Sequence, residues 1–201
     1  AGGGVVGLTP GMLTAVGRDV DCLQIRLSPL LAHAVFGDAD PTGVLPLDAM
    51  WGNDAQRLCA RLQAASSWDE RFTIATTELA RRAASGPSVD PEVTATWRAM
   101  VRSEGRIRIE RIADDIGWSR KRLWSRFGTQ VGLPPKRAAQ LIRFDTAAHR
   151  LATGTAPAEV AHTCGYADQS HLHRDARSFA GLTPAGVAEA PWLDVDDVAW
   201  R

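Results

Sequence analysis

The chain has 201 residues and no net charge, because its 23 Lys and Arg side chains balance its 23 Asp and Glu side chains. This length predicts one or two domains, and since no run of 18 apolar residues occurs, a membrane-spanning helix is excluded. The three cysteines are odd in number and widely spaced, which excludes a disulfide framework and favours a reducing, cytoplasmic location.

The neutral total conceals an uneven distribution of charge. Residues 97–190 carry 15 basic and 9 acidic side chains, residues 1–96 carry 7 and 11, and the last eleven residues carry 1 and 3. A basic segment beside an acidic one is typical of a module that contacts a polyanion joined to a part that does not.

The first 84 residues predict a mainly helical region with one candidate strand. Residues 1–20 are glycine-rich and have no charged n-region, so no signal peptide is expected, and the missing initiator Met suggests a trimmed or partial N-terminus. Cys22 to Leu27 alternate apolar and polar residues, which predicts a strand. The remaining expectations are helices from Ser28-Pro29 to about Gly37, from Asn53 or Asp54 to about Ala64, and from a cap at Ser67 to about Ala84, with a loop over 38–46 and a short apolar turn over 47–51. In the last helix Phe72, Ile74, Ala75 and Leu79 are expected to lie inside.

Residues 85–89, which contain Ser, Gly and Pro, predict a linker. Asp90 is then expected to cap a helix whose first residue is Pro91. The helical region after this point extends to about residue 190 and is followed by an acidic tail over 191–201.

The stretch from Ile109 to Phe127 predicts two short helices joined by a tight turn. Ile109, Ile112, Ala113 and Ile116 recur at helical spacing, Gly117 can end that helix with positive φ, and Ser119 can cap the next one. In the second helix Leu123 and Phe127 form the buried side, and the rest is largely basic. A short apolar helix, a glycine turn and a basic helix are typical of a helix-turn-helix, whose second helix enters the DNA major groove.

The same pattern occurs again over Glu159 to Phe179, where Gly165-Tyr166 follows Gly117-Trp118 by 48 residues. Its turn is one residue longer, so Leu172 takes the place of Leu123. Between the two copies, Pro134 to Ala152 predicts a long helix with an apolar stripe of Leu141, Phe144, Ala148 and Leu151. At 1.5 Å per residue this helix spans roughly 25–30 Å, close to the ~34 Å between successive major-groove segments on one DNA face.

Two helix-turn-helix units joined by one long helix resemble the C-terminal domain of AraC-type (AraC/XylS) bacterial transcription factors. The matching residues are Ile112-Ala113, Gly117, Ser119, Leu123, Phe127, Gly132-Leu133-Pro134-Pro135, Arg143-Phe144, Val160-Ala161, Gly165-Tyr166, Asp168 to Leu172, Arg174, Phe179 and Gly181-Leu182-Thr183-Pro184. The resemblance covers about residues 97–190. One departure is Ala176, where the family usually has a larger apolar residue, and Phe179 is the candidate to fill that space.

The resemblance and the helix geometry together select the expected DNA contacts. Family positions for base contacts fall on Lys121, Trp124 and Ser125, whereas Arg120, Arg122 and Arg126 are interpreted as phosphate contacts. In the second unit the candidates are Gln169, Ser170, His171 and Arg174, with Gln169 expected mainly to support the start of the helix. Partial burial of Trp124 and a plain solvated face for the arginines remain the alternatives.

Other chemistries fit the sequence less well. Cys164, His162, His171 and His173 lack the spacing of a zinc finger, and Cys164 falls at an apolar position of the repeat, so no metal or other cofactor is expected. A DNA-repair enzyme that shares this DNA-binding domain would need a reactive cysteine, but all three cysteines lie in apolar contexts, which quiet a thiol. A third interpretation is a non-enzymatic interaction module that uses Trp51, Trp68 and Phe72, although aromatic residues at helical spacing are more often core.

The sequence therefore predicts a mainly α protein with three parts and a tail. Residues 1–84 form an N-terminal regulatory or dimerisation region, 85–89 a linker, and 90–190 the double helix-turn-helix domain, before the tail over 191–201. The predicted function is sequence-specific regulation of transcription, without enzymatic activity. Its predicted partner is double-stranded promoter DNA, and RNA polymerase, a second copy of the chain and an unidentified small-molecule effector are further candidates.

Overall fold

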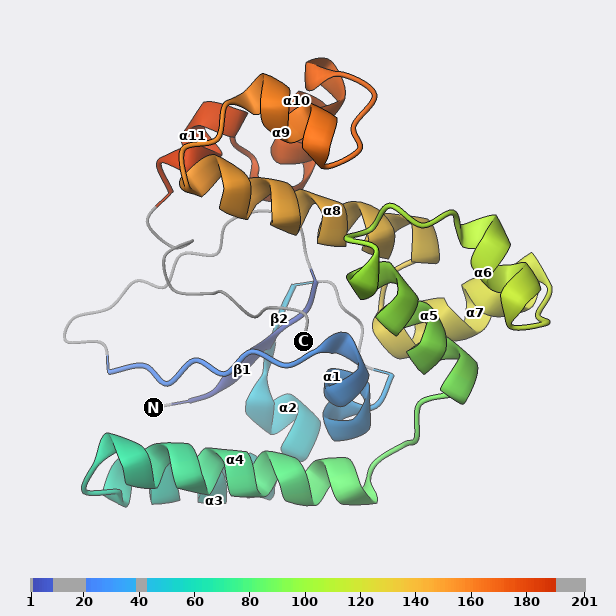
Figure 1. Ribbon diagram of the computed structural model, residues 1–201. Coiled ribbons are helices and arrows are strands. Elements are labelled where there is room, and N and C mark those ends of the chain that lie inside the picture. The colour runs from blue at the N-terminus through green and yellow to red at the C-terminus, as the bar shows by residue number, and fades with distance from the viewer. Residues whose placement is uncertain (1, 9–20, 39–42, 191–201) are drawn as a thin grey trace. The chain divides into compact units, whose positions relative to one another are not determined.

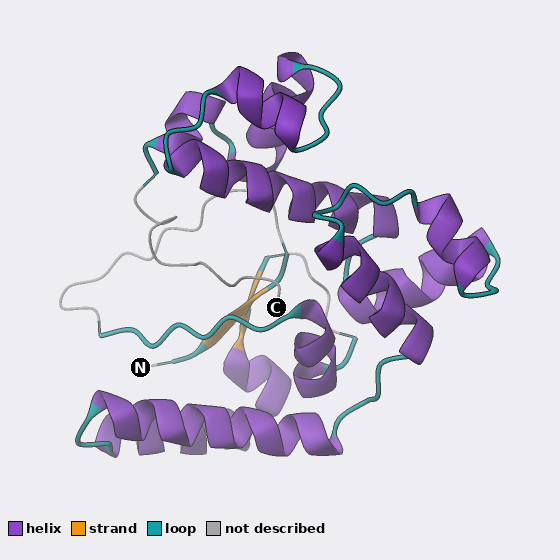
Figure 2. Cartoon of the chain, viewed as in Figure 1, coloured by secondary structure: helices purple, strands orange, loops and turns teal. Residues whose placement is uncertain are grey.

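The computed structural model describes residues 2–8, 21–38 and 43–190, and these ranges contain eleven helices and two short strands (Figures 1 and 2). The chain divides into two compact units, the first built mainly from residues before 90 and the second mainly from residues after it. The mainly α prediction is therefore confirmed. No helix among the described ranges is long and apolar enough to cross a membrane.

The first unit contains both strands and four helices. Strand β1 (Gly4–Val6) pairs antiparallel with β2 (Val44–Pro46), so that Val5 lies opposite Leu45. The helices are α1 (Pro29–Phe36), α2 (Leu47–Trp51), α3 (Asn53–Ala64) and α4 (Trp68–Ser85). Helices α1 and α4 start where the sequence predicts, because the hydroxyls of Ser28 and Ser67 accept hydrogen bonds from the amides of Leu31 and Glu70.

The strand predicted over Cys22–Leu27 is wrong, because that segment has no regular secondary structure. Its alternation is real, since Leu23, Ile25 and Leu27 are half-buried and the residues between them are exposed. A strand also needs a partner for its backbone hydrogen bonds, and the short ladder of this unit forms instead between β1 and β2. Strand β2 in turn occupies the end of the predicted 38–46 loop, and the predicted 47–51 turn is helix α2.

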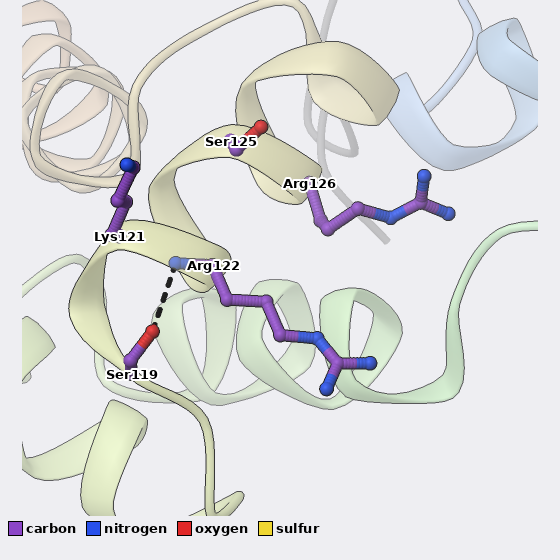
Figure 3. Close-up of a pocket in the computed structure, with 5 residues that line it drawn as sticks. All are labelled: Ser119, Lys121, Arg122, Ser125 and Arg126. Atoms are coloured by element: carbon purple, nitrogen blue, oxygen red, sulfur yellow. Dashed lines mark hydrogen bonds between the residues drawn. The ribbon is translucent and has the colours of Figure 1, made fainter.

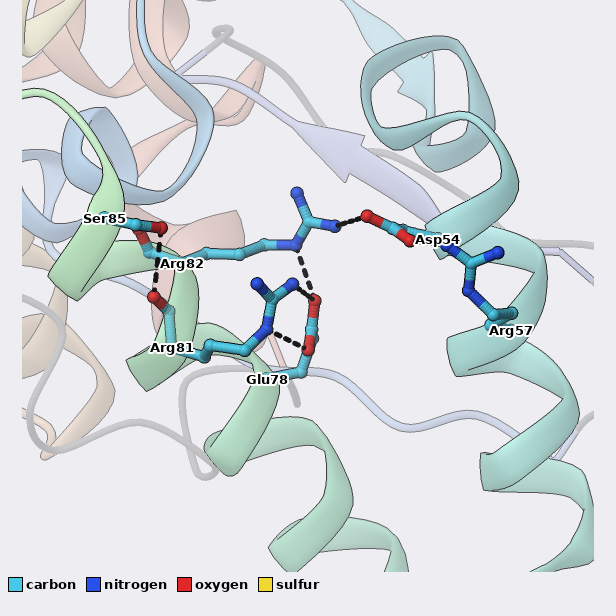
Figure 4. Close-up of polar contacts among 6 residues, drawn as sticks. All are labelled: Asp54, Arg57, Glu78, Arg81, Arg82 and Ser85. Carbon is cyan, nitrogen blue, oxygen red and sulfur yellow. Dashed lines mark hydrogen bonds and ion pairs between the residues drawn. The ribbon is translucent and has the colours of Figure 1, made fainter.

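A network of ion pairs connects α3 to α4 (Figure 4). The Glu78 carboxylate accepts hydrogen bonds from Arg81 at 2.6 and 2.9 Å and from Arg82 at 2.7 Å, and Arg82 also reaches Asp54 at 3.0 Å. The Arg82 guanidinium lies 3.9 Å from the centre of the Trp51 ring. Hydrogen bonding by Arg81, followed by that of Arg82 and the charges of both, lowers the pKa of Glu78 to about 2.

One predicted core residue of α4 lies at the surface. Phe72 is 46% exposed and Trp68 43% exposed, with their ring centroids 6.3 Å apart, whereas Ala75 on the same stripe is buried. The stripe is covered at Ala75 but not at Phe72, so the prediction that Phe72 lies inside is wrong.

In the described residues of the second unit, all regular secondary structure is helical. It comprises α5 (Pro91–Arg102), α6 (Ile109–Asp115), α7 (Arg120–Val131), α8 (Pro135–Ala152), α9 (Pro157–Thr163), α10 (Gln169–Ala180) and α11 (Pro184–Ala188). Proline is the first residue of four of these helices, where its missing N–H costs nothing. Both predicted helix-turn-helix units and the long helix between them are present.

Each helix-turn-helix unit has its own apolar centre. In the first, Leu123 and Phe127 are fully buried, and the Trp97 ring centroid lies 6.5 Å from that of Phe127. In the second, residues of α8, α9, α10 and α11 form one buried cluster, whose large members include Phe144, Leu151, Val160, Leu172, Phe179 and Val187. Leu141, predicted to belong to the α8 stripe, is only partly buried against this cluster.

The small residue at position 176 lies inside the apolar cluster of the second unit. Ala176 is fully buried, and the Phe179 ring stacks on that of Phe144 with 5.5 Å between centroids and 18° between planes. Phe179 and Ala176 thus belong to the same buried cluster, and filling of the space beside Ala176 by Phe179 stays a prediction.

Candidate nucleic-acid interface

The start of α7 is fixed by the turn that precedes it. Gly117 adopts φ of +68°, a left-handed conformation that glycine takes without strain, and the hydroxyl of Ser119 accepts a hydrogen bond of 3.2 Å from the amide of Arg122. Leu123 and Phe127 then anchor one side of the helix. The opposite side of α7 must consequently face outward.

The outward side of α7 carries most of the predicted contact residues. Arg120, Lys121 and Ser125 are exposed, and Trp124 is half-buried, so the alternative of partial burial applies to its ring. Figure 3 shows a shallow hollow on this helix, with Lys121 pointing to one side and Arg122 and Arg126 to the other. The hollow is lined by Ser119, Lys121, Arg122, Ser125 and Arg126.

Two of the predicted phosphate-binding arginines are engaged within the protein. The Arg122 guanidinium lies 4.3 Å from the centre of the Trp118 ring. Arg126 donates two hydrogen bonds to the Asp90 carboxylate, at 2.7 and 2.9 Å. The side chain of Asp90 therefore does not cap α5 as predicted, although Asp90 does precede the first helical residue. The 36 residues between the two partners explain why local patterns did not find this pair.

Helix α10, the counterpart of α7 in the second unit, also has a defined start. The Asp168 carboxylate accepts a hydrogen bond of 2.7 Å from the amide of His171. Asp168 thus caps α10, and the side chain of Gln169 is exposed. Ser170 and Arg174 are exposed too, while His171 is half-buried with its ring edge-on to Tyr166.

Polar residues that the sequence reasoning missed tie α10 to α8. Arg143 reaches the Asp175 carboxylate at 3.3 Å, and its guanidinium lies 4.6 Å from the centre of the Tyr166 ring. Arg137 donates a 2.8 Å hydrogen bond to the Ser178 hydroxyl. The sequence held one signal for this ion pair, which is that Asp175 adjoins Ala176 on the buried side of α10. A buried carboxylate needs a partner, so a basic residue was to be expected nearby.

The surroundings of Tyr166 change the pKa of its hydroxyl. Burial raises the pKa of Tyr166 above its ordinary value, and the nearby charge of Asp175 raises it further. The phenol is therefore neutral throughout the physiological range. Its contribution at this site is an uncharged ring placed between α8 and α10.

The residues weighed for other chemistries are dispersed. Among the described residues, no group of three or more His, Cys, Asp and Glu side chains could hold a metal ion. Cys164 is 1% exposed, and burial raises the pKa of its thiol, which disfavours the nucleophilic thiolate. Cys22 is exposed, so the expectation of an apolar setting for all three cysteines is wrong at this position, and Cys59 is half-buried.

Comparison with known proteins finds a match over the region that contains both α7 and α10. Residues 112–190 match a family model described as a helix-turn-helix domain. Among solved structures, the chain is similar to the C-terminal domain of AraT, a response regulator from Geobacillus stearothermophilus, with 18% identity and a TM-score of 0.47 over 55% of this chain and 98% of that one. No curated protein matches the sequence.

Proposed function

We propose that the protein is an AraC-type regulator of transcription that binds specific promoter DNA with α7 and α10 in adjacent major grooves. This proposal is supported by the match of residues 112–190 to a helix-turn-helix domain and by the resemblance of both units to the AraC-type family. The observation that carries this proposal is the duplication of the motif. Each recognition helix starts at a side-chain cap, is anchored by buried apolar residues, and directs polar and basic side chains outward.

The chemistry of each side chain indicates whether it suits a base or a phosphate. Lys121 can donate to guanine O6 or N7, Ser125 can donate or accept, and Trp124 can pack on a thymine methyl group. Arg120 and Arg174 are exposed cations suited to phosphate oxygens, which set register and make binding dependent on salt. Arg126, which is paired with Asp90, would contribute to phosphate binding only when it exchanges that partner.

The length of α8 constrains the geometry of the complex. Its 18 residues correspond to about 27 Å, whereas successive major-groove segments on one face of straight DNA are ~34 Å apart. We therefore expect the DNA to bend toward the protein. A circular-permutation gel with the bound site at different positions would reveal this bend as a change in mobility, and unchanged mobility would rule it out.

Selection from random DNA tests specific binding and identifies the preferred site at the same time. Rounds of selection from a random duplex pool should enrich one sequence, and fluorescence anisotropy then compares that duplex with a scrambled one across a salt series. We expect a preference of about 10³ or more and a steep salt slope. Equal, weak binding to both duplexes would contradict the proposal.

Lys121→Ala and Lys136→Ala make a matched pair for this assay. Both lysines are exposed, but Lys121 lies on the outer face of α7 and Lys136 on α8. Lys121→Ala should lower the preference for the selected duplex by about tenfold, since a good base contact is worth ~1–3 kcal/mol. Lys136→Ala should leave that preference unchanged.

A second role, self-association through the first unit, is favoured by the distribution of exposed apolar side chains. Among the residues that the structure describes, the large apolar ones with high exposure are Val6, Leu31, Val44, Trp68 and Phe72, all in the first unit. We propose that the Trp68–Phe72 surface of α4 contributes to a homodimer. Sedimentation equilibrium should then show a dimer that Trp68→Ser with Phe72→Ser dissociates and Leu31→Ser does not. A wild-type monomer at all concentrations would refute this role.

A further inference from the structure

The turn before α10 places an aromatic ring against one of the expected DNA-contacting side chains. Tyr166 is 6% exposed, and its ring centroid lies 5.1 Å from that of His171 with the two planes at 90°. This edge-to-face arrangement is favourable for aromatic pairs. Because His171 is only half-buried, part of its imidazole rests on Tyr166 while part stays accessible.

Tyr166 is in turn held by α8. The Arg143 guanidinium lies over the Tyr166 ring and pairs with Asp175 at 3.3 Å. The two charged side chains are only 15% and 8% exposed, so solvent and salt screen the pair weakly. Asp175 follows His171 by four residues, which places both on the same side of α10. The ion pair therefore fixes the helix on α8 close to His171.

The backbone of His171 is fixed as well. Its amide donates the 2.7 Å hydrogen bond to Asp168 that caps α10. The contact with Tyr166 thus restrains the His171 ring, and the hydrogen bond to Asp168 restrains its backbone. By contrast, Ser170 and Arg174 are exposed side chains on the same helix.

We infer that His171 reads the N7 atom of a purine in the major groove and that Tyr166, supported by Arg143 and Asp175, is its positioning residue. This inference rests on the proposed function and deepens it. An imidazole ring offers an N–H donor, and N7 is an acceptor that both purines present in the major groove. Because the ring is oriented before binding, little side-chain freedom is lost when the contact forms.

The test removes the acceptor atom from the DNA. Each purine of the selected site is replaced in turn by its 7-deaza analogue, in which a C–H group takes the place of N7. Wild-type protein should lose about fivefold to tenfold in affinity at one purine of the half-site bound by α10, the worth of one hydrogen bond. The salt slope should not change, since no phosphate contact is lost.

Variants then identify the side chain responsible. His171→Ala should bind the normal and the 7-deaza duplex equally, whereas His173→Ala, at an exposed position two residues along α10, should behave as wild type. Tyr166→Phe, which keeps the ring, should retain the difference between duplexes. Tyr166→Leu should lose most of it, and Asp175→Asn serves as the second positioning variant if Tyr166→Leu does not fold.

Two results would overturn the inference. One is a 7-deaza effect that persists in His171→Ala, and the other is the absence of any such effect in the second half-site of wild-type complexes. If the wild-type protein bound the selected and the scrambled duplex equally, this result would instead refute the proposed function. The two failures are therefore distinguishable in the same experiment.

Discussion

Gly105→Ala should destabilise the second unit strongly, because the turn between α5 and α6 lies directly on α8. Gly105 has φ of +71°, and a Cβ atom there would lie 2.1 Å from the carbonyl oxygen of Ala139 and 2.8 Å from the amide nitrogen of Arg143. Both neighbours are backbone atoms of a helix whose adjoining side chains, Ala138 and Ile142, are buried. A rotamer change therefore cannot relieve the clash.

The magnitude follows from two contributions. Left-handed backbone costs a non-glycine residue about 1–2 kcal/mol, and forced displacement within a packed core costs about 1–3 kcal/mol more. Replacing glycine also stiffens the unfolded chain, which offsets about 0.4–1 kcal/mol. The expected net loss in the free energy of unfolding is about 3 kcal/mol.

Gly117→Ala is the matched control, since Gly117 has φ of +68° but a Cβ atom added there would meet no other atom within 4 Å. It should cost only the backbone strain, about 1 kcal/mol. The stability losses of both variants are measured by urea unfolding of the full chain, monitored by far-UV circular dichroism. With an m-value of about 2 kcal/mol per M, Gly105→Ala should unfold about 1 M earlier than Gly117→Ala. Equal midpoints would refute the close approach of this turn to α8.

Three further results are expected. Asp90→Asn should raise affinity for any duplex and steepen the salt slope by about one unit, because Arg126 becomes available to phosphate; lower affinity in anisotropy would contradict this. The Glu78 carboxylate, with its pKa lowered to about 2, stabilises the fold above about pH 4.5, and this stabilisation disappears as the pH falls toward 2. Glu78→Gln should therefore lower the urea midpoint at pH 6 by the equivalent of about 1 kcal/mol but have little effect near pH 2, and a constant difference would be inconsistent with the ion pairs. Among the thiols, exposed Cys22 should react rapidly with a disulfide reagent in the native protein, whereas buried Cys164 should react only on unfolding. The rapid reaction should therefore be absent from Cys22→Ser, and its persistence in that variant would contradict this assignment.

The helix-turn-helix units could be predicted because their determinants are local. The spacing of Ile109, Ile112 and Ala113, the turn at Gly117 and the cap at Ser119 all act within a few residues of one another. Each of these features is present in the structure. Short-range rules on helix ends and apolar spacing therefore gave these elements and their buried sides.

The remaining features depend on contacts between distant segments. Cys22 to Leu27 alternate as a strand does, but whether a segment pairs is decided by a partner that its own sequence does not specify. Phe72 continues an apolar stripe, but its burial depends on what packs against the N-terminal part of α4. Arg126 and Asp90, 36 residues apart, and Arg143 and Asp175, 32 apart, are likewise pairs that only the folded chain brings together.

The central claim, that two recognition helices occupy adjacent major grooves, is tested most directly by methylation interference at guanine N7 on the selected duplex. Two clusters of interfering guanines should appear on one face, separated by about one helical turn of 10–10.5 base pairs. Lys121→Ala should weaken the interference in one cluster, and His171→Ala should weaken it in the other. A single cluster, or two clusters to which both variants contribute equally, would contradict binding by α7 and α10 in separate grooves.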